Sequence, residues 1–343
     1  MSAAVLVDAP QIPVTRPVLS PERSPNLTTI ADAPHDLRTP SEAILASVEN
    51  VIIGKNEVIR LALCGLVAGG HVLIEDRPGV GKTTLAKALA TSLGCAFKRV
   101  QCTPDLLPSD ITGVSIFNQK TSEFEFRPGP IFTNVLLADE ITRTTPKTQS
   151  SLLEAMEEFQ VTVDGVSYPL PRPFYVIATQ NNIEYQGTYP LPEAQMDRFL
   201  MRIEIGYPSR EEEALVLASQ MKRHPLRDVV AVVASEDVQE LQQSIHDVDV
   251  DPALQQYIVD LTANTRTHAG VAVGASPRGS LALLQAARAW AVLDGRGYCT
   301  PDDVKILALP VLAHRILLNS SKQSSSERSV IQDALDTVSV PVF

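Results

Sequence analysis

A glycine-rich loop between a strand and a helix constrains the fold of this chain more than any other feature. An apolar segment, 71–76, leads into the loop, and a segment with helical spacing, 82–93, follows it. In that context glycines let backbone N–H groups turn inward around phosphate oxygens, and the helix N-terminus adds a favourable dipole. We therefore predict a phosphate-binding loop. Its residues are Pro78, Gly79, Val80, Gly81, Lys82, Thr83 and Thr84.

Two side chains of this loop have specific expected roles. Lys82 is expected to reach the β- and γ-phosphates of a nucleotide, and Thr83 to hold Mg²⁺ through its hydroxyl. One nearby position departs from the usual pattern, because Asp76 stands five residues before Gly81, where glycine is normal. The pattern places this carboxylate close to the phosphates and gives it no role.

A second strand supplies two acids. The apolar run 135–138 is typical of a buried strand, and Asp139 and Glu140 follow at its carboxyl end. We expect Asp139 to support Mg²⁺, directly or through water, and Glu140 to orient and polarise an attacking water. A small-molecule kinase needs no such water, so Glu140 favours hydrolysis.

The alternation of strands with helices predicts an α/β fold with a parallel sheet. Besides 71–76 and 135–139, strands are expected near 97–102, 174–179 and 200–205, which makes five. Two segments interrupt this rhythm and are predicted to be hairpins, at 114–127 and 160–170. In the second, Asp164-Gly165 forms a two-residue turn between alternating strands.

The chain is expected to divide into three parts. Residues 1–40 carry seven prolines and are predicted to be a disordered tail. Residues 41–208 form the α/β nucleotide-binding domain, and 209–343 a helical domain. In the latter, Ser209 and Glu212 form a capping box, and further helices fit 251–266, 276–293 and 300–318.

Three polar side chains outside the loop are candidates for the reaction. Asn181 follows a strand end, where its amide is able to bond the γ-phosphate or the lytic water. Arg198 precedes the fifth strand, and its planar, permanently charged guanidinium suits transition-state charge on phosphate. Arg278 lies in the first turn of a helix, against the helix dipole, so we expect an anion nearby. Taken alone, each arginine is equally consistent with a surface ion pair.

Charge and composition limit the possible partners. The formal net charge is −11, and no run of lysine or arginine is present, which weighs against binding of bulk nucleic acid. The start of the chain lacks a secretory signal, and no apolar run approaches a membrane span, so we expect a cytoplasmic protein. The four cysteines are scattered, which favours free thiols over a metal site or disulfides.

Taken together, the motifs resemble those of the MoxR family of AAA+ ATPases in order, over about residues 41–320. The resemblance rests on 78–84, 127–132, 139–143, 145–158, 178–181, 191–199 and 274–278. It implies an AAA+ core with a small helical lid, which assembles into a ring, usually hexameric, and hydrolyses ATP with Mg²⁺ between subunits. Residues 114–127 resemble the family's helix-2 insert, and 160–170 the hairpin before sensor 1.

The resemblance also implies roles for individual residues. Asn181 matches sensor 1, Arg198 the arginine finger that reaches a neighbour's γ-phosphate, and Arg278 the sensor-2 arginine. Ile53 and Gly54 resemble the segment that packs on adenine. Many relatives have asparagine where Thr142 stands and proline where Asn182 stands, so the role of that asparagine is not carried over to Thr142, while Arg143 stays a candidate contact between subunits.

Three functions are compatible with these patterns. The first is a chaperone or remodelling motor that acts on a protein client, such as a metalloenzyme under maturation, with a partner that contains a von Willebrand factor A (VWA) domain. The second is a nucleic-acid motor related to the minichromosome-maintenance helicases, which share the insert and the hairpin but do not fit the acidic charge. The third is a nucleotide-dependent scaffold that rarely hydrolyses ATP.

Overall fold

The computed structural model describes residues 40–182, 187–221, 223–319 and 326–342. The predicted proline-rich tail lies outside the described residues, apart from Pro40, which begins the first helix.

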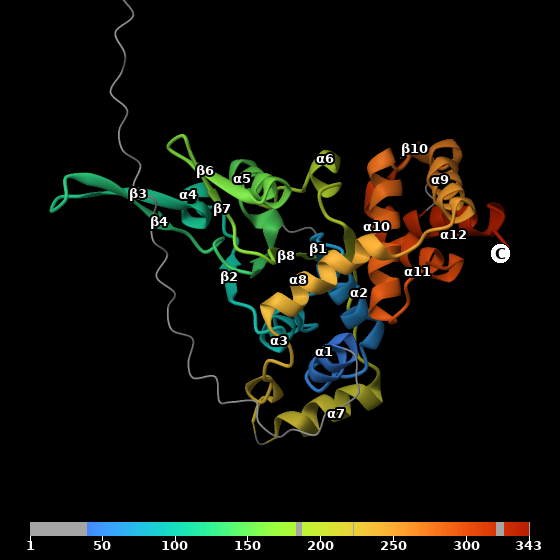
Figure 1. Ribbon diagram of the computed structural model, residues 1–343, viewed down its shortest axis with the longest axis horizontal. Helices are drawn as coiled ribbons and strands as arrows, with labels where there is room; N and C mark the ends of the chain where they lie inside the picture. The colour runs from blue at the N-terminus through green and yellow to red at the C-terminus, as the bar shows by residue number, and fades with distance from the viewer. Residues whose placement is uncertain (1–39, 183–186, 222, 320–325, 343) are drawn as a thin grey trace, which may run out of the picture. The chain divides into compact units, whose positions relative to one another are not determined.

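A parallel sheet of five strands lies at the centre, in the order β2-β5-β8-β1-β9 (Figure 1). This confirms the predicted five-stranded α/β sheet. Successive residues of the inner strands face opposite sides of the sheet. Leu73 and Ile74, for example, belong to two different hydrophobic clusters, one on each face. Burial on both faces explains the unbroken apolar runs in the sequence. The strands are β1 (Val72–Glu75), β2 (Phe97–Gln101), β5 (Val135–Asp139), β8 (Tyr175–Gln180) and β9 (Met201–Ile203).

Helices cover both faces of the sheet. The first cluster joins one face to α1, α2, α3 and the helices of the C-terminal region, so the lid shares a hydrophobic core with the nucleotide-binding region. A division near 208 stays a prediction. The second cluster packs α4 and α5 on the other face. The helices on the sheet are α1 (Pro40–Glu49), α2 (Asn56–Val67), α3 (Lys82–Ser92), α4 (Pro108–Thr112), α5 (Pro146–Glu158) and α6 (Glu193–Met196). Those that follow are α7 (Arg210–Gln220), α8 (Ser235–Ser244), α9 (Pro252–Thr267), α10 (Pro277–Leu293), α11 (Pro301–Leu312) and α12 (Glu327–Thr337).

Both predicted hairpins are present. The first pairs β3 (Gly113–Asn118) with β4 (Glu123–Pro128), and the second pairs β6 (Gln160–Val163) with β7 (Val166–Pro169). The turn of the second has Asp164 at φ 51° and Gly165 at φ 79°, as a two-residue turn between twisted strands requires. The Phe126 and Tyr168 rings stack with centroids 4.0 Å apart and so tie the two hairpins together.

The predicted helix over 300–318 is too long. Helix α11 ends at Leu312, a 3-10 turn follows at Ala313–Arg315, and β11 (Leu317–Leu318) then pairs with β10 (Val271–Val273). Arg315 is buried, with its guanidinium on Asp197 and on backbone carbonyls that precede β9. Helical periodicity continues past Leu312, but these tertiary contacts end the helix.

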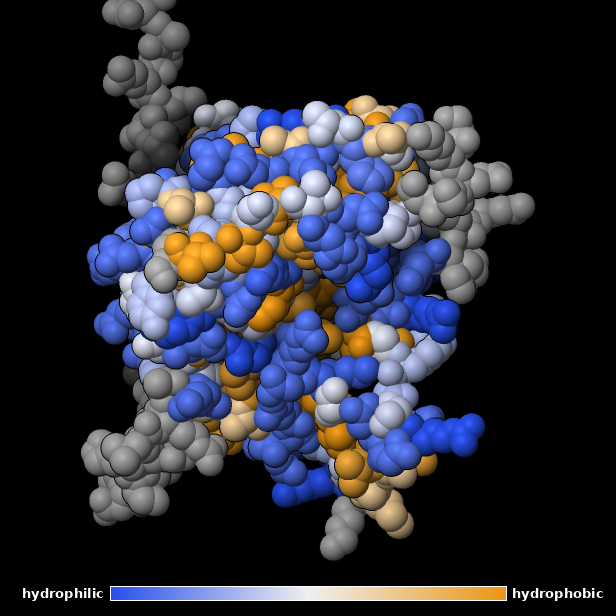
Figure 2. Space-filling model, turned by 90° about the vertical axis from the view of Figure 1, so that its right-hand side faces the viewer, coloured by the Kyte–Doolittle hydropathy of each residue, from blue (hydrophilic) through white to orange (hydrophobic). Residues whose placement is uncertain are grey.

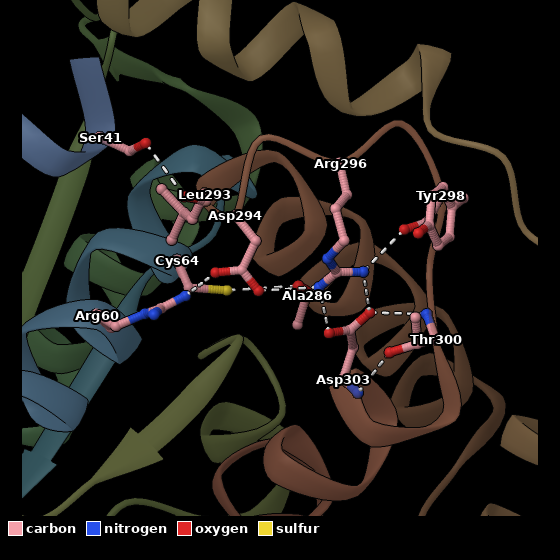
Figure 3. A network of polar contacts seen from close by, with 10 residues as sticks. All are labelled: Ser41, Arg60, Cys64, Ala286, Leu293, Asp294, Arg296, Tyr298, Thr300 and Asp303. Atoms are coloured by element: carbon pink, nitrogen blue, oxygen red, sulfur yellow. Dashed lines mark hydrogen bonds and ion pairs between the residues drawn. The ribbon is translucent and has the colours of Figure 1, made fainter. Parts of the chain in front are cut away.

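A charged network joins α2 to the lid (Figure 3). Arg60 of α2 pairs with Asp294 and lies over the Trp290 ring, 4.6 Å from its centroid. Arg296 pairs with Asp294 and with both oxygens of Asp303, at 2.9 and 2.6 Å. The two carboxylates raise the pKa of Arg296 above its ordinary value. The lid is therefore held to α2 by ion pairs in addition to the shared core.

None of the helices in the described part of the chain combines the length and the apolar character needed to cross a membrane.

His71 provides a pH-dependent stability test. Its Nδ1 accepts from Val176 N at 3.1 Å, its Nε2 donates to Met156 O at 3.0 Å, and the ring is buried. Burial lowers the pKa of His71 from 6.5 to about 4, so the folded state holds the neutral ring. Below pH 6.5 the unfolded chain binds a proton at His71, whereas the folded chain binds it only near pH 4. The contribution of His71 to the free energy of unfolding is therefore complete above pH 6.5 and is lost as the pH falls.

We expect His71 to lower the free energy of unfolding by about 3 kcal/mol between pH 7.5 and 4. Urea titrations of the wild type and of His71→Gln, which does not titrate, isolate this contribution. Equal pH slopes for the two proteins would contradict the assignment.

Candidate functional site

The predicted phosphate-binding loop connects β1 to α3. Gly79 and Gly81 adopt φ of 84° and 99°, in the left-handed region that glycine enters without a steric penalty. No side chain of the described residues caps α3, so its first N–H groups stay free to bind an anion. The loop therefore has the backbone form that phosphate binding requires.

Lys82 lies at the centre of the site. Its ammonium donates to Gln180 O at 2.8 Å and to Asn181 Oδ1 at 3.1 Å, and it also bonds Asp76 O. Burial lowers the pKa of Lys82, while nearby carboxylates, Asp76 first among them, oppose that shift. The contacts join the predicted phosphate-binding lysine to the predicted sensor-1 asparagine.

Asp76, which had no role in the sequence pattern, is explained by its hydrogen bonds. Its Oδ1 accepts from Arg77 N at 2.6 Å, and its Oδ2 accepts from Ile205 N and Gly206 N at 2.7 and 2.6 Å. The carboxylate is buried and bound to the chain that leaves β9. A glycine at this position is unable to make these contacts.

Thr179 links the two acids of the second motif. Its hydroxyl donates to Asp139 Oδ1 at 2.6 Å and accepts from Glu140 N at 2.8 Å. Glu140 has φ 59°, uncommon for a residue with a side chain, and the Thr179 bond holds this backbone in place. Thr179 is buried on β8, which pairs with β5 in parallel.

The carboxylate of Glu140 is held by three side chains. Asn181 Nδ2 donates to Oε1 at 3.2 Å, and Gln101 Nε2 donates to Oε2 at 3.3 Å. Arg143 pairs with Oε2 at 3.1 Å. Asn181 thus contacts both Lys82 and Glu140, and the structure brings these predicted site residues together.

Arg99 of β2 was not expected at the site. Its Nε and Nη2 lie 3.0 and 2.6 Å from Asp139 Oδ2, and Nη2 also donates to Gln101 at 2.6 Å. Sequence reasoning missed Arg99 and Gln101 because only the pairing of β2 with β5 places Gln101 opposite Asp139. No local motif marks them.

The donor set fits Mg²⁺. The Thr83 hydroxyl lies in the first turn of α3, and the Asp139 carboxylate ends β5 at the same edge of the sheet. Hard oxygen donors of this kind, few in number, suit a cation that keeps several waters and binds nucleotide phosphates.

Arg198 and Arg278 share one carboxylate. Arg198 Nη2 lies 3.3 Å from Glu157 Oε2, and Arg278 Nη2 lies 3.0 Å from Glu157 Oε1. Arg278 is the more exposed, at 58% of its side chain. Glu157 is the anion expected near Arg278 from its position in the first turn of α10. The structure brings the two arginines together, and within the described part of the chain their ion pairs do not involve the phosphate-binding loop.

The segment 53–54 lies near the loop. The neighbouring Ile52 approaches Gly81, since a Cβ on that glycine would lie 3.9 Å from Ile52 Cδ1. Gly54 has φ 75°, and Glu212 from the first turn of α7 packs directly on it. The placement of Ile53 and Gly54 is compatible with an adenine contact, which stays a prediction.

The chain is similar to known proteins over most of its length. Residues 71–201 match the ATPase family associated with various cellular activities (AAA), and 263–335 match the AAA lid domain. The chain is 52% identical to protein YeaC of Bacillus subtilis, over 86% of this chain and 93% of the relative. It is 41% identical to chaperone MoxR1 of Mycobacterium tuberculosis, over 88% and 82%. A crystal structure from Cytophaga hutchinsonii, 39% identical, superposes with a TM-score of 0.81 and covers 88% of this chain and 95% of its own.

Asp76 is a test of how the loop is supported. Asp76→Ala removes the acceptor of three backbone N–H groups, so we expect a loss of about 2–4 kcal/mol in the free energy of unfolding. Asp76→Asn keeps one acceptor oxygen and should lose less. Urea unfolding at pH 7 measures both variants, and an Asp76→Ala protein as stable as the wild type would contradict the role given to this carboxylate.

Proposed function

Because the chain belongs to the MoxR family of AAA+ ATPases, we propose that it hydrolyses ATP and uses the released free energy to remodel protein clients. The single observation that carries this proposal is the placement of Glu140. Its carboxylate lies within hydrogen-bond distance of Asn181 and beside Asp139, and Asn181 in turn contacts Lys82.

Each group has a proposed part in hydrolysis. Lys82 and the N–H groups of the loop bind the phosphates, and Thr83 and Asp139 hold Mg²⁺, which neutralises charge on the phosphate oxygens. Glu140 orients and polarises the attacking water, and its fixed backbone keeps the carboxylate aimed. Asn181 is placed to bond the γ-phosphate or that water.

We propose that the site is completed by a second subunit in a ring, as a hexamer. Arg198 and Arg278 bind Glu157 within one subunit, so they present two cations at one surface. A guanidinium that stabilises charge on the transferred phosphoryl accelerates such reactions by about 10³–10⁵-fold when supplied in trans. In the ring, both arginines act on the nucleotide of the neighbour.

The kind of client is suggested by a relative. The name of the Mycobacterium tuberculosis relative describes a chaperone, which supports a protein client. A metalloenzyme under maturation as that client, and a partner with a VWA domain, are further parts of the proposal that rest on the resemblance of the motifs to the MoxR family. A cytoplasmic location belongs to the same proposal. The net charge of −11 disfavours the nucleic-acid motor.

Glu140→Gln tests the carrying observation. We expect ATP hydrolysis to fall at least about 100-fold, because the amide does not polarise water as the carboxylate does. ATP binding, measured by titration calorimetry, should stay within about twofold, because the phosphate-binding groups are intact. The exposed Glu154→Gln on α5 is the matched control. Undiminished hydrolysis in Glu140→Gln would contradict the role given to Glu140. If the control variant also lost hydrolysis, misfolding would be the cause, which circular dichroism detects.

A further inference from the structure

Arg315 is a buried cation to which the proposed hydrolysis gives no part. It lies in the 3-10 turn after α11, within the region that matches the AAA lid domain. Figure 2 shows mostly hydrophilic residues on the face that carries the lid helices, as expected where charges meet water. The side chain of Arg315, by contrast, is only 4% exposed. A guanidinium is costly to bury without partners, so its contacts indicate its role.

The guanidinium of Arg315 binds the turn between α6 and β9. Its Nε donates to Asp197 Oδ1 at 2.7 Å, and its Nη2 donates to Asp197 O at 3.3 Å and to Phe199 O at 2.7 Å. Its Nη1 donates to Leu200 O at 3.1 Å and to Val311 O of α11. These five oxygen acceptors match the five N–H groups of a guanidinium, and four of them belong to the turn.

Arg198 lies in this turn, outside the helix and the strand on either side of it. Regular helix or strand hydrogen bonding therefore does not fix its position. Arg315 binds the residues immediately before and after it, Asp197 and Phe199. Arg315 thus holds the backbone from which the Arg198 side chain extends.

The same arginine packs against the first turn of α10, which carries Arg278. Gly279 follows Arg278 directly and is buried. A Cβ at Gly279 would lie 3.4 Å from Arg315 Cδ, so the helix closely approaches the aliphatic part of this side chain. Burial lowers the pKa of Arg315, the Asp197 carboxylate opposes that shift, and the charge of Arg278 adds to it. Arg315 therefore touches the chain next to each of the two arginines that share Glu157.

We propose that Arg315 is a positioning residue that aligns Arg198 and Arg278 for the nucleotide of a neighbouring subunit. The inference rests on the proposed ring, in which both arginines act in trans. Arg315 acts through them, because its own N–H groups are engaged within its own subunit. Its planar fork joins the lid to the turn that carries Arg198. A movement of the lid therefore moves both guanidinium groups together.

Arg315→Lys tests the role of the fork. Lysine keeps the charge beside Asp197 but has only three donors on one atom, so the carbonyls of the turn lose their fixed partner. We expect kcat for ATP hydrolysis to fall at least about tenfold, because misplacement of a reacting group by about 1 Å costs about 100-fold. The KM for ATP should stay within about twofold, since the phosphate-binding groups are intact.

The matched control is Arg296→Lys. Arg296 is also an arginine of the lid whose fork binds a carboxylate, that of Asp303, in the network that holds the lid to α2. We expect this change to leave kcat within about twofold of the wild type, because the two sites share no contact partner among the described residues. An equal fall of kcat in Arg296→Lys and Arg315→Lys would overturn the proposal.

Mixed rings separate a positioning role from a structural one. Mixed with Lys82→Ala, Arg315→Lys should regain hydrolysis, because its intact phosphate site meets a correctly placed Arg198 of the other variant. Mixed with Arg198→Ala, it should gain nothing, because no subunit then supplies a correctly placed Arg198. A damaged subunit gains nothing in either mixture, and a role at its own nucleotide gives the opposite pattern. Either result would overturn the proposal, as would a wild-type kcat in Arg315→Lys.

Asp197→Asn is a second variant in case circular dichroism shows that Arg315→Lys does not fold. It keeps an acceptor oxygen for Nε and removes the charge that balances Arg315, and we expect the same pattern in the two mixtures. The mixture of Lys82→Ala with Arg198→Ala tests the ring itself. Recovery there, without recovery of the Arg315 or Asp197 variant beside Lys82→Ala, overturns this inference alone. No recovery in any mixture overturns the trans arrangement as well.

Discussion

The parallel pairing of β1, β5 and β8 is the constraint on which the rest of the site depends. Parallel strands direct their carboxyl ends to one edge, so Asp76, Asp139 and Gln180 lie at the same edge of the sheet although they are far apart in the chain. Each strand contributes a different element of the site. The first leads into the phosphate-binding loop, the second ends in the two acids, and the third supplies Thr179, whose hydroxyl joins those acids. Lys82 contacts the end of the third strand at Gln180. The side-chain amide of Asn181, the residue after that strand, lies between Lys82 and Glu140.

Local sequence patterns were sufficient for the elements that are defined locally. The glycine-rich loop, the two acids after an apolar run and the Asp164-Gly165 turn each depend on a few adjacent residues, and the structure places each as predicted. Contacts between distant segments were not predictable in this way. Arg99, Gln101 and Glu157 belong to the site only through strand order and helix packing, and Asp76 was unexplained until its bonds to the chain after β9 were known. The predicted helix over 300–318 was wrong for the same reason, because the burial of Arg315 ends it early.

Among the described residues of one subunit, the predicted site residues fall into two groups. Asn181 contacts Lys82 and Glu140, and Thr179 joins Glu140 to Asp139, whereas Arg198 and Arg278 bind Glu157. The lid that carries Arg278 is held to its own core by a shared hydrophobic cluster and by the Arg60–Asp294–Arg296–Asp303 network (Figure 3). Both arginines are thus attached firmly to their own subunit. We propose that in a ring both arginines act on the nucleotide of a neighbour.

The central claim is that two subunits share one active site, and a mixture of two inactive variants tests it most directly. Lys82→Ala loses its own phosphate contact, and Arg198→Ala loses the cation that it supplies to a neighbour. In an equal mixture with free exchange, about one quarter of the interfaces combine an intact Lys82 with an intact Arg198. The account predicts ATP hydrolysis in the mixture well above that of either variant alone, approaching about one quarter of the wild-type rate. No gain over the separate variants, with subunit exchange shown by fluorescence energy transfer, would contradict it.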